Sequence, residues 1–469
     1  MTLSAKTSTE NGTPGDLESI HRPVVVVGGG QAGLSMSYCL TQRGVEHIVL
    51  ERDRVGHEWR DRRWDSFCLV TPNWQCQLPD FPYSGDDPDG FMVREGIVRY
   101  IEEYAKYFDP PVVEGVAATR LRRDRQGRYL VGTSRGELIT DQVVLATGPY
   151  QVPLIPRLAE RLPDGLTQLH SSQYRNPDQL PPGAVLVVGT GQSGCQIAED
   201  LHLAGRQVHL AVGSAPRVAR FYRGRDVVAW LDAVGYYRKA VEDFADVDAV
   251  RFRVNHYVTG RDGGRDIDLR AFARDGMRLY GRLAGVTAGV TGAVLRFAPD
   301  LAKNLDHADA VSESIKDSID SYIDALGIDN LGIDAAPEPR YTPVWAPERE
   351  PTQLDLGDTG ITSVIWSTGF GRDDRWIEVP VFDGRGYPTH DRGVTSSPGL
   401  YFLGLPWQHT WGSGRLSGVA EDAAYLTDYI TTRANLGAAQ SDHLFRWIAG
   451  TSTSTYPRDD EWVAPRTVA

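Results

Sequence analysis

Two glycine-rich turns hold the residues whose types and spacing best fit a defined chemistry. The first turn, Gly28–Gly33, reads GGGQAG and fits the pattern GxGxxG, and Glu51 lies twenty-three residues beyond Gly28. In this pattern the glycines permit a tight turn, a close approach of a diphosphate and close packing of a helix, while the acid accepts hydrogen bonds from a ribose. The sequence therefore predicts a dinucleotide site formed by Gly28, Gly30, Gln31, Ala32, Gly33, Glu51 and Arg52.

The second turn has the same spacing but lacks the acid. After the strand that ends near Val212 the chain continues as Gly213–Arg217, with no carboxylate at the ribose position. Ser214 and Arg217 could bind a 2′-phosphate, which favours NADPH over NADH. The alternative is that Arg217 is a surface arginine, since Arg220, Arg223 and Arg225 lie close by. The predicted residues of this second site are Gly189, Thr190, Gly191, Gln192, Ser193, Gly194, Ser214 and Arg217.

Each turn is flanked by the elements that a βαβ unit requires. Four valines, Val24–Val27, predict a buried parallel strand, followed by a helix over 34–40 and a second strand over His47–Leu50. The second unit repeats this order, with strands over Val185–Val188 and Val208–Val212 and a helix that ends at Gly205. The sequence thus predicts an α/β protein with two Rossmann-like dinucleotide-binding domains.

Composition excludes several classes of function. The chain has 469 residues and a net charge of −13, from 49 Lys plus Arg against 62 Asp plus Glu, which disfavours binding to nucleic acid or to an anionic membrane. Its four cysteines form no CxxC pair, so neither a redox dithiol nor a thiolate metal site is expected, and no metal is predicted. No apolar run predicts a signal peptide or a membrane-spanning helix, and we expect a cytoplasmic protein.

Four motifs together resemble one known family, the class B flavin-dependent monooxygenases, which include the flavin-containing monooxygenases, YUCCA-type enzymes and Baeyer–Villiger relatives. They are the first turn with Glu51, the segment Ala146–Gly148 followed by Pro153 and Pro156, the run His170–Tyr174, and Ser367–Phe370. The family pattern FxGxxxHxxxW/Y is matched only at His170 and Tyr174, because Asp164 and Leu166 stand at its phenylalanine and glycine positions. The resemblance extends from Pro23 to about Ile430.

The resemblance implies FAD at the first turn and NADPH at the second. It implies that residues 23–155 and 371–469 form a discontinuous FAD-binding domain and that 156–370 form the NADPH-binding domain. Residues 1–22 are rich in Ser, Thr, Glu and Gly, which predicts a flexible leader. Two helical stripes, over Leu269–Tyr280 and Ala308–Leu326, predict a helical insertion over about 218–345. We expect it to shape the pocket or an oligomer contact, as in a homodimer. The further flavin-side residues that the resemblance implies are Trp59, Arg60, Thr71, Thr147, Gly148, Gly369, Trp411 and Gly412.

The activity that the resemblance implies is insertion of one oxygen atom from O2 into a small organic substrate, by N-, S- or Baeyer–Villiger-type oxygenation. NADPH would reduce the flavin, and the reduced flavin would form a C4a-(hydro)peroxide. The catalytic residue is not identified, and the candidates are His170, Tyr174, His409 and Trp411. For each histidine a structural role is the alternative. The alternative functions are an NADPH oxidase or oxidoreductase that inserts no oxygen, and a flavoprotein redox sensor.

Overall fold

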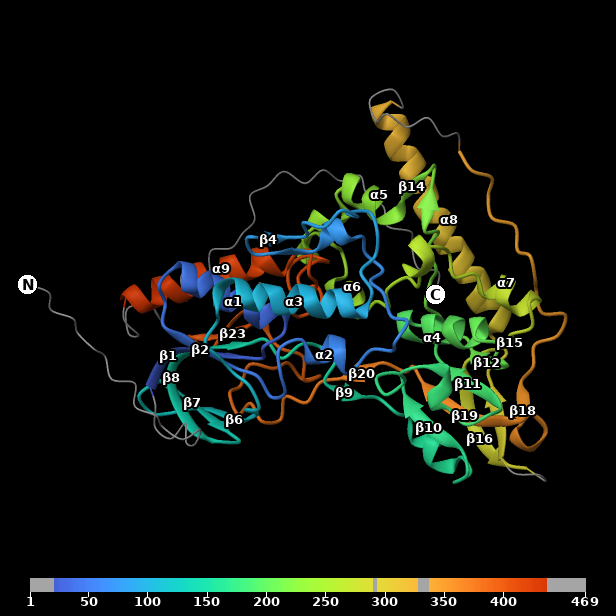
Figure 1. Cartoon of the computed structure of the whole chain (residues 1–469), viewed down its shortest axis with the longest axis horizontal. Coiled ribbons are helices and arrows are strands. Elements are labelled where there is room, and N and C mark those ends of the chain that lie inside the picture. Colours follow the sequence, from blue (N-terminus) through green and yellow to red (C-terminus); the bar gives the residue numbers. More distant parts are fainter. Residues whose placement is uncertain (1–20, 290–292, 328–336, 437–469) are drawn as a thin grey trace, which may run out of the picture.

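The computed structural model describes residues 21–289, 293–327 and 337–436, which form two lobes side by side (Figure 1). The first lobe is built on a nine-stranded sheet. Its order is β21-β22-β23-β8-β1-β2-β5, with β7 pairing β8 and β6 pairing β7. The strands are β1 (His21–Val27), β2 (His47–Leu50), β5 (Val112–Val113), β6 (Ala118–Arg123), β7 (Tyr129–Thr133), β8 (Gly136–Leu145), β21 (His390–Asp391), β22 (Val394–Thr395) and β23 (Leu400–Phe402).

Strand β1 lies at the centre of this sheet because its valines are buried on both faces. It pairs in parallel with β2 and β8, with Val24 opposite His47 and Val25 opposite Val143. One face is covered by the helices α1 (Gln31–Gln42), α3 (Arg94–Phe108) and α9 (Val419–Leu436). The side chains on the other face form a core with Leu121 of β6, with Tyr129 and Val131 of β7, and with residues 377–381.

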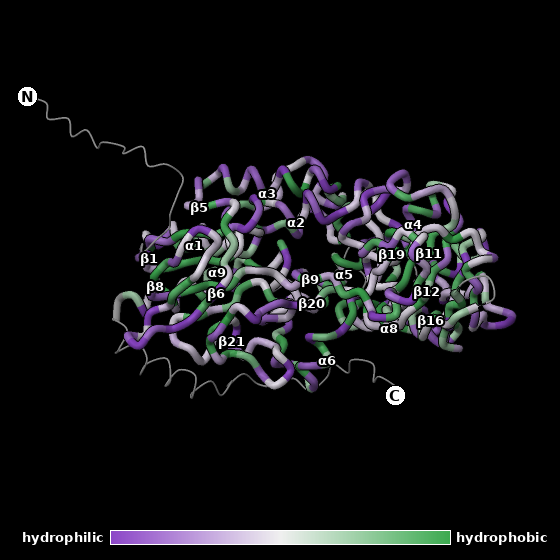
Figure 2. The backbone as a smooth tube through the Cα atoms, turned by 90° about the horizontal axis from the view of Figure 1, so that it is seen from below, coloured by the Kyte–Doolittle hydropathy of each residue, from purple (hydrophilic) through white to green (hydrophobic). Residues whose placement is uncertain are grey.

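The second lobe holds a five-stranded parallel sheet of order β10-β19-β11-β12-β15, formed by β10 (Thr167–His170), β11 (Ala184–Val188), β12 (Val208–Ala211), β15 (Arg278–Tyr280) and β19 (Ile361–Trp366). Helix α4 (Gln192–Leu203) packs on one face, and an antiparallel sheet of β16 (Leu283–Ala288), β17 (Ala293–Phe297) and β18 (Gln353–Asp355) packs on the other. Figure 2 shows apolar segments gathered inside each lobe, at β1 and β8 and at β11 and β19. The predicted two-domain α/β fold is confirmed.

The two chain segments that connect the lobes pair with each other. β9 (Val152–Pro153) runs antiparallel to β20 (Phe370–Gly371), with Phe370 opposite Pro153. These segments lie close to the boundaries that the sequence predicts, at 155/156 and 370/371. Of the predicted leader, residues 1–20 lie outside the described residues, whereas His21 and Arg22 belong to β1.

The segment from 218 to 345 is not helical throughout. The stripe predicted over Leu269–Tyr280 divides, because Gly276 adopts a positive φ of 108° and the chain then enters β15 of the parallel sheet. The hairpins β13–β14 and β16–β17 also belong to this segment. Its elements outside the sheets already described are α5 (Val227–Ala233), α6 (Val247–Arg251), α7 (Leu269–Arg274), α8 (Leu301–Leu326), β13 (Phe221–Tyr222) and β14 (Arg225–Asp226).

The remaining elements are short. Helix α2 (His57–Arg60) follows β2, and the hairpin of β3 (Gln77–Leu78) and β4 (Phe81–Pro82) precedes α3. Within the described ranges, no helix combines the length and the apolar character that crossing a membrane requires.

Candidate active site

The first glycine turn has the geometry that a bound diphosphate requires. Gly28 has a φ of 112°, and a Cβ there would lie 2.4 Å from the carbonyl oxygen of Ala146. Gly30 is the N-cap of α1, and a Cβ on it would meet no atom within 4 Å. No side chain caps this helix, so its first N–H groups are left for a ligand.

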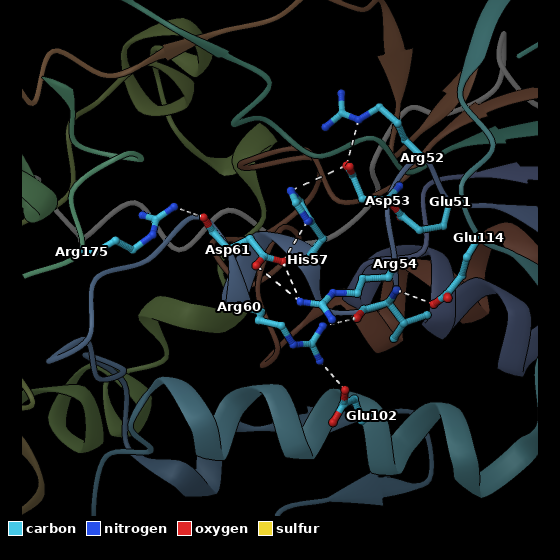
Figure 3. Close-up of polar contacts among 11 residues, drawn as sticks. Glu51, Arg52, Asp53, Arg54, His57, Arg60, Asp61, Glu102, Glu114 and Arg175 are labelled. Carbon is cyan, nitrogen blue, oxygen red and sulfur yellow. Dashed lines mark hydrogen bonds and ion pairs between the residues drawn. The ribbon is translucent and has the colours of Figure 1, made fainter.

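The Glu51 carboxylate is fixed at this turn by two backbone donors. Its Oε2 accepts a hydrogen bond from the N–H of Gly29 at 2.7 Å, and its Oε1 accepts one from the N–H of Asp53 at 2.8 Å. Figure 3 shows the surrounding network, in which Arg52 donates to Asp53 at 3.0 Å. Glu51 and Arg52 both line the large cavity described below.

The two residues predicted on α2 have different surroundings. Trp59 lines the cavity, and its Nε1–H donates to Oε1 of Gln31 at 3.2 Å. Arg60 is absent from the cavity lining, because its guanidinium donates to Glu102 of α3 and to the carbonyl of Val55 (Figure 3).

The second glycine turn repeats the geometry of the first. A Cβ on Gly194 would lie 1.9 Å from the carbonyl oxygen of Gly189, whereas Gly191 has open space around it. Thr190 Oγ1 accepts a hydrogen bond from the N–H of Gly213 at 2.9 Å, which ties the turn to the end of β12. Helix α4 also lacks a side-chain cap at Gly191.

Arg217 is not the free cation that was expected to bind a 2′-phosphate. Its side chain is buried, its Nε lies 2.6 Å from Oδ1 of Asp309, and its guanidinium stacks on Tyr341 at 4.0 Å from the ring centroid. Asp309 belongs to α8, whose approach no local pattern around Arg217 predicts. Ser214 is exposed, but neither it nor Arg217 lines the cavity.

One cavity of about 860 Å³ is shared by both turns. It is lined at the first turn by Gly28 and Gly30 and at the second by Gly191 and Ser193. Its lining contains most of the predicted flavin-side and nucleotide-side residues, namely Gly28, Gly30, Gln31, Ala32, Glu51, Arg52, Trp59, Thr71, Thr147, Gly148, Gly191, Gln192, Ser193, Gly369 and Trp411. The predicted residues outside the lining are Gly33, Arg60, Gly189, Thr190, Gly194, Ser214, Arg217 and Gly412.

His170 and Tyr174 are buried beside this cavity rather than facing it. His170 Nδ1 lies 3.0 Å from Ser172 Oγ, and its Nε2 lies 3.0 Å from the carbonyl oxygen of Gly369. Burial lowers the pKa of His170, which favours the neutral imidazole. The Tyr174 hydroxyl donates to Asp200 Oδ2 at 2.7 Å. Both side chains therefore hold neighbouring groups in place.

The other two candidates lie on the segment after β23. His409 is absent from the cavity lining, and its Nδ1 lies 3.6 Å from Glu242 Oε2. Trp411 lines the cavity, with the ring of Tyr237 at 4.4 Å between centroids. Trp411 is thus the one predicted catalytic candidate that faces the cavity.

Sequence reasoning missed several lining residues that come from distant segments. They share no motif, so only the folded chain brings them together. They are Arg62, Arg63, Tyr150, Tyr236, Tyr237, Arg253, Asn255 and Arg415.

A family model described as pyridine nucleotide-disulphide oxidoreductase matches residues 25–259. The chain belongs to this family. A relative from Geobacillus kaustophilus, an uncharacterised CzcO-like oxidoreductase, is 33% identical over 410 residues, which are 87% of this chain and 97% of that protein. An indole-3-pyruvate monooxygenase of the YUCCA group from Arabidopsis thaliana is 31% identical over 203 residues, covering 41% of this chain and 48% of that protein.

Two solved structures show a similar fold. A flavin-containing monooxygenase from Stenotrophomonas maltophilia superposes with a TM-score of 0.59 at 20% identity, covering 88% of this chain and 99% of that chain. An ornithine N-hydroxylase from Kutzneria sp. 744, solved with reduced FAD and NADP⁺, also gives 0.59, at 16% identity, with 88% and 100% covered. The predicted resemblance to class B flavin monooxygenases is confirmed, and the chain is an oxidoreductase.

The family name refers to a disulphide, and the cysteines of this chain are all described. Cys39, Cys68, Cys76 and Cys195 are free thiols. Burial raises the pKa of Cys76 to about 12 and of Cys68 to about 11. None of the four lines the cavity. Within the described residues no cluster of His, Cys, Asp and Glu could hold a metal ion.

Proposed function

We propose that this chain is an FAD-dependent, NADPH-consuming monooxygenase that inserts one oxygen atom from O2 into a small organic substrate. The observation that carries the proposal is the single cavity lined by both glycine turns, because hydride transfer between two nucleotides requires their reactive rings to meet in one space. The flavin monooxygenases among the relatives support the same reaction class.

FAD fits the first turn and the lobe of residues 23–155 and 371–436. The uncapped start of α1 and the open space at Gly30 suit the diphosphate, and Glu51 suits the ribose. Trp59, Thr147 and Trp411 line the part of the cavity that would hold the flavin ring.

NADPH fits the second turn, within residues 156–370. Gly191 presents the uncapped start of α4 to the cavity, and Gln192 and Ser193 lie beside it. His170 positions the peptide of Gly369, which lines the cavity between the two lobes. The nucleotides, when bound, supply the hydride and pass electrons to dioxygen.

The side chains around the cavity bind, orient and exclude water. Valines and a leucine of the α5 region, with the aromatic rings of Trp407 and Trp411, form an apolar wall. Such a wall limits the access of water to a reactive centre. A side-chain nucleophile is not required for this chemistry.

The alternative is an NADPH oxidoreductase or oxidase that uses the same two nucleotides and inserts no oxygen. A dithiol version of it is disfavoured by the cysteines. Cys195 is the cysteine nearest a glycine turn, and it is buried, donating from Sγ to the carbonyl of Thr190 at 3.3 Å.

The proposal is tested with purified protein loaded with FAD. We expect NADPH to reduce the bound flavin faster than NADH does, and the reduced protein to consume oxygen when air is admitted. Formation of an oxygenated product then separates a monooxygenase from an oxidase. Reduced protein that does not react with oxygen would contradict the proposal and favour the oxidoreductase alternative.

A further inference from the structure

Arg415 lines the cavity without a carboxylate partner. Its Nη2 donates to Asn255 Oδ1 at 3.1 Å, its Nη1 donates to the carbonyl of Trp411, and its guanidinium lies 3.7 Å from the Trp411 ring centroid. Among the residues that the structure describes, no Asp or Glu forms an ion pair with it. The Arg415 side chain is partly buried, and this burial lowers its pKa.

The fully buried arginines of the second lobe are paired with acids. Arg217 and Arg270 both pair with Asp309, at 2.6 and 2.8 Å, and Arg223 pairs with Asp320 at 2.8 Å. A buried cation is costly unless an anion compensates it. Arg415 is partly buried and lines the cavity with no such acid beside it, which is the state expected of a cation whose anion arrives with a ligand.

A second arginine lies beside the same group. Arg253 lines the cavity, is exposed, and its guanidinium forms no hydrogen bond or ion pair with any residue in the described ranges. Arg253 and Arg415 both act electrostatically on the phenol of Tyr236, so both cations lie within electrostatic range of this ring. Together with the amide of Asn255 they offer several donors to one anion.

The neighbouring wall is aromatic and apolar. Tyr236 meets Trp407 edge to face at 6.0 Å, and Tyr237 stacks at a tilt on Trp411 at 4.4 Å. Val228 and Leu231 of α5 line the same cavity. A ligand with an anionic end and an apolar or aromatic body fits this arrangement, because each part meets a matching surface.

We propose that the substrate is an organic carboxylate, held by Arg415 and Arg253 with its body against the wall of Tyr236, Tyr237 and Trp411. That this carboxylate is oxygenated rests on the proposed function, whereas its binding to the two arginines does not. A phosphate of the nicotinamide nucleotide is the other source of an anion. We favour the carboxylate because the backbone N–H groups at Gly191 already suit the phosphates, whereas Arg415 lies among aromatic rings.

Binding of matched acids and amides tests the proposal without turnover. FAD-loaded protein is titrated by calorimetry with phenylacetate, 3-phenylpropanoate and hexanoate, and with the amide of each. We expect at least one acid to bind about tenfold more tightly than its amide, the ratio that one charge-assisted contact provides. If no acid binds more tightly than its amide, the proposal is overturned.

Variants of the two arginines locate the effect. In Arg415→Ala we expect the preference for the acid over its amide to disappear, while the affinity for the amide is kept. Arg415→Lys should restore part of this preference. Arg253→Ala should lose a smaller part of the preference for the acid, and because Arg253 is exposed the fold is kept. The control is Arg128→Ala, which removes an exposed arginine paired with Asp124 in the first lobe.

The same variants separate the two sources of the anion. If Arg415→Ala weakens NADPH binding and leaves the preference for the acid unchanged, the site belongs to the nucleotide and the proposal is wrong. Loss of oxygen insertion with retained acid binding would instead contradict the proposed function alone.

Discussion

The carboxylate of Glu51 accepts a hydrogen bond from the backbone N–H of Gly29 at 2.7 Å, which joins the end of β2 to the first glycine turn. This contact fixes the acid before any nucleotide binds. At the second turn a hydroxyl takes the place of the carboxylate, since Thr190 Oγ1 accepts a hydrogen bond from the N–H of Gly213. The two turns thus have one backbone geometry and different polar partners, which suits two different nucleotides in one cavity.

Replacing Glu51 weakens FAD binding. Glu51→Ala removes the acceptor of the Gly29 and Asp53 N–H groups and the proposed partner of the ribose. We expect the dissociation constant of FAD to rise about tenfold, as for loss of a hydrogen bond to a charged group. Titration of the apoprotein with FAD measures it. Glu46→Ala is the control, because that acid is exposed and pairs with Arg22, away from the glycine turn. An equal effect in both variants would refute the assignment.

A side chain at Gly191 blocks NADPH without disturbing FAD. The backbone there is extended and a Cβ has open space, so Gly191→Val is compatible with the fold and projects into the cavity. We expect KM for NADPH to rise about tenfold at unchanged FAD content. Gly165→Val is the matched control, since Gly165 also has open space but is not in the cavity lining. An unchanged KM in Gly191→Val would contradict the location of the second nucleotide.

Tyr174 contributes to stability rather than to the reaction. Its hydroxyl is buried and donates to Asp200, which also accepts from Ser66 at 2.6 Å and pairs with Arg261 at 2.9 Å. Tyr174→Phe should lower the free energy of unfolding by about 1 kcal/mol and leave kcat nearly unchanged. Urea unfolding and steady-state kinetics measure the two effects. A large loss of kcat at unchanged stability would instead assign Tyr174 a catalytic role.

His209 makes the stability depend on pH. Burial, followed by the charge of Arg278, lowers its pKa from 6.5 to about 4, and its Nδ1 lies 2.9 Å from the Tyr280 hydroxyl. Between pH 6.5 and about pH 4, His209 therefore binds a proton in the unfolded chain but stays neutral in the folded protein. The contribution of His209 to the free energy of unfolding is fully present above pH 6.5. It is lost as the pH drops toward 4, which lowers the free energy of unfolding by roughly 3 kcal/mol.

Unfolding of His209→Phe across this range measures the contribution. The variant should show a shallower dependence of unfolding free energy on pH than the wild-type protein, whatever its absolute stability. His21→Gln, at an exposed position, is the control and should keep the wild-type slope. Parallel slopes for His209→Phe and wild type would show that His209 is not the group responsible.

The two βαβ units could be predicted from the sequence because their signals are local. Val24–Val27 and His47–Leu50 carry a buried-strand pattern, and glycines mark the turns between elements. The structure places β2 at the predicted residues and begins α4 at Gln192, directly after the second turn.

The rest depends on contacts between distant segments. Arg217 was predicted to bind a phosphate, yet its partner Asp309 stands ninety-two residues away, on a helix whose packing the local sequence does not encode. Arg415 and Asn255 meet across one hundred and sixty residues, so the cations of the cavity could not be grouped from spacing. His170 and Tyr174 carry a family motif, but only their burial shows that they position other groups.

The balance of NADPH, dioxygen and hydrogen peroxide during turnover tests the central claim most directly. FAD-loaded protein is supplied with NADPH, isotopically heavy dioxygen and, one at a time, the acids of the binding series. For at least one acid we predict less hydrogen peroxide than NADPH consumed, and a product that carries one heavy oxygen atom. Hydrogen peroxide equimolar with NADPH for every compound would contradict the claim and identify an oxidase.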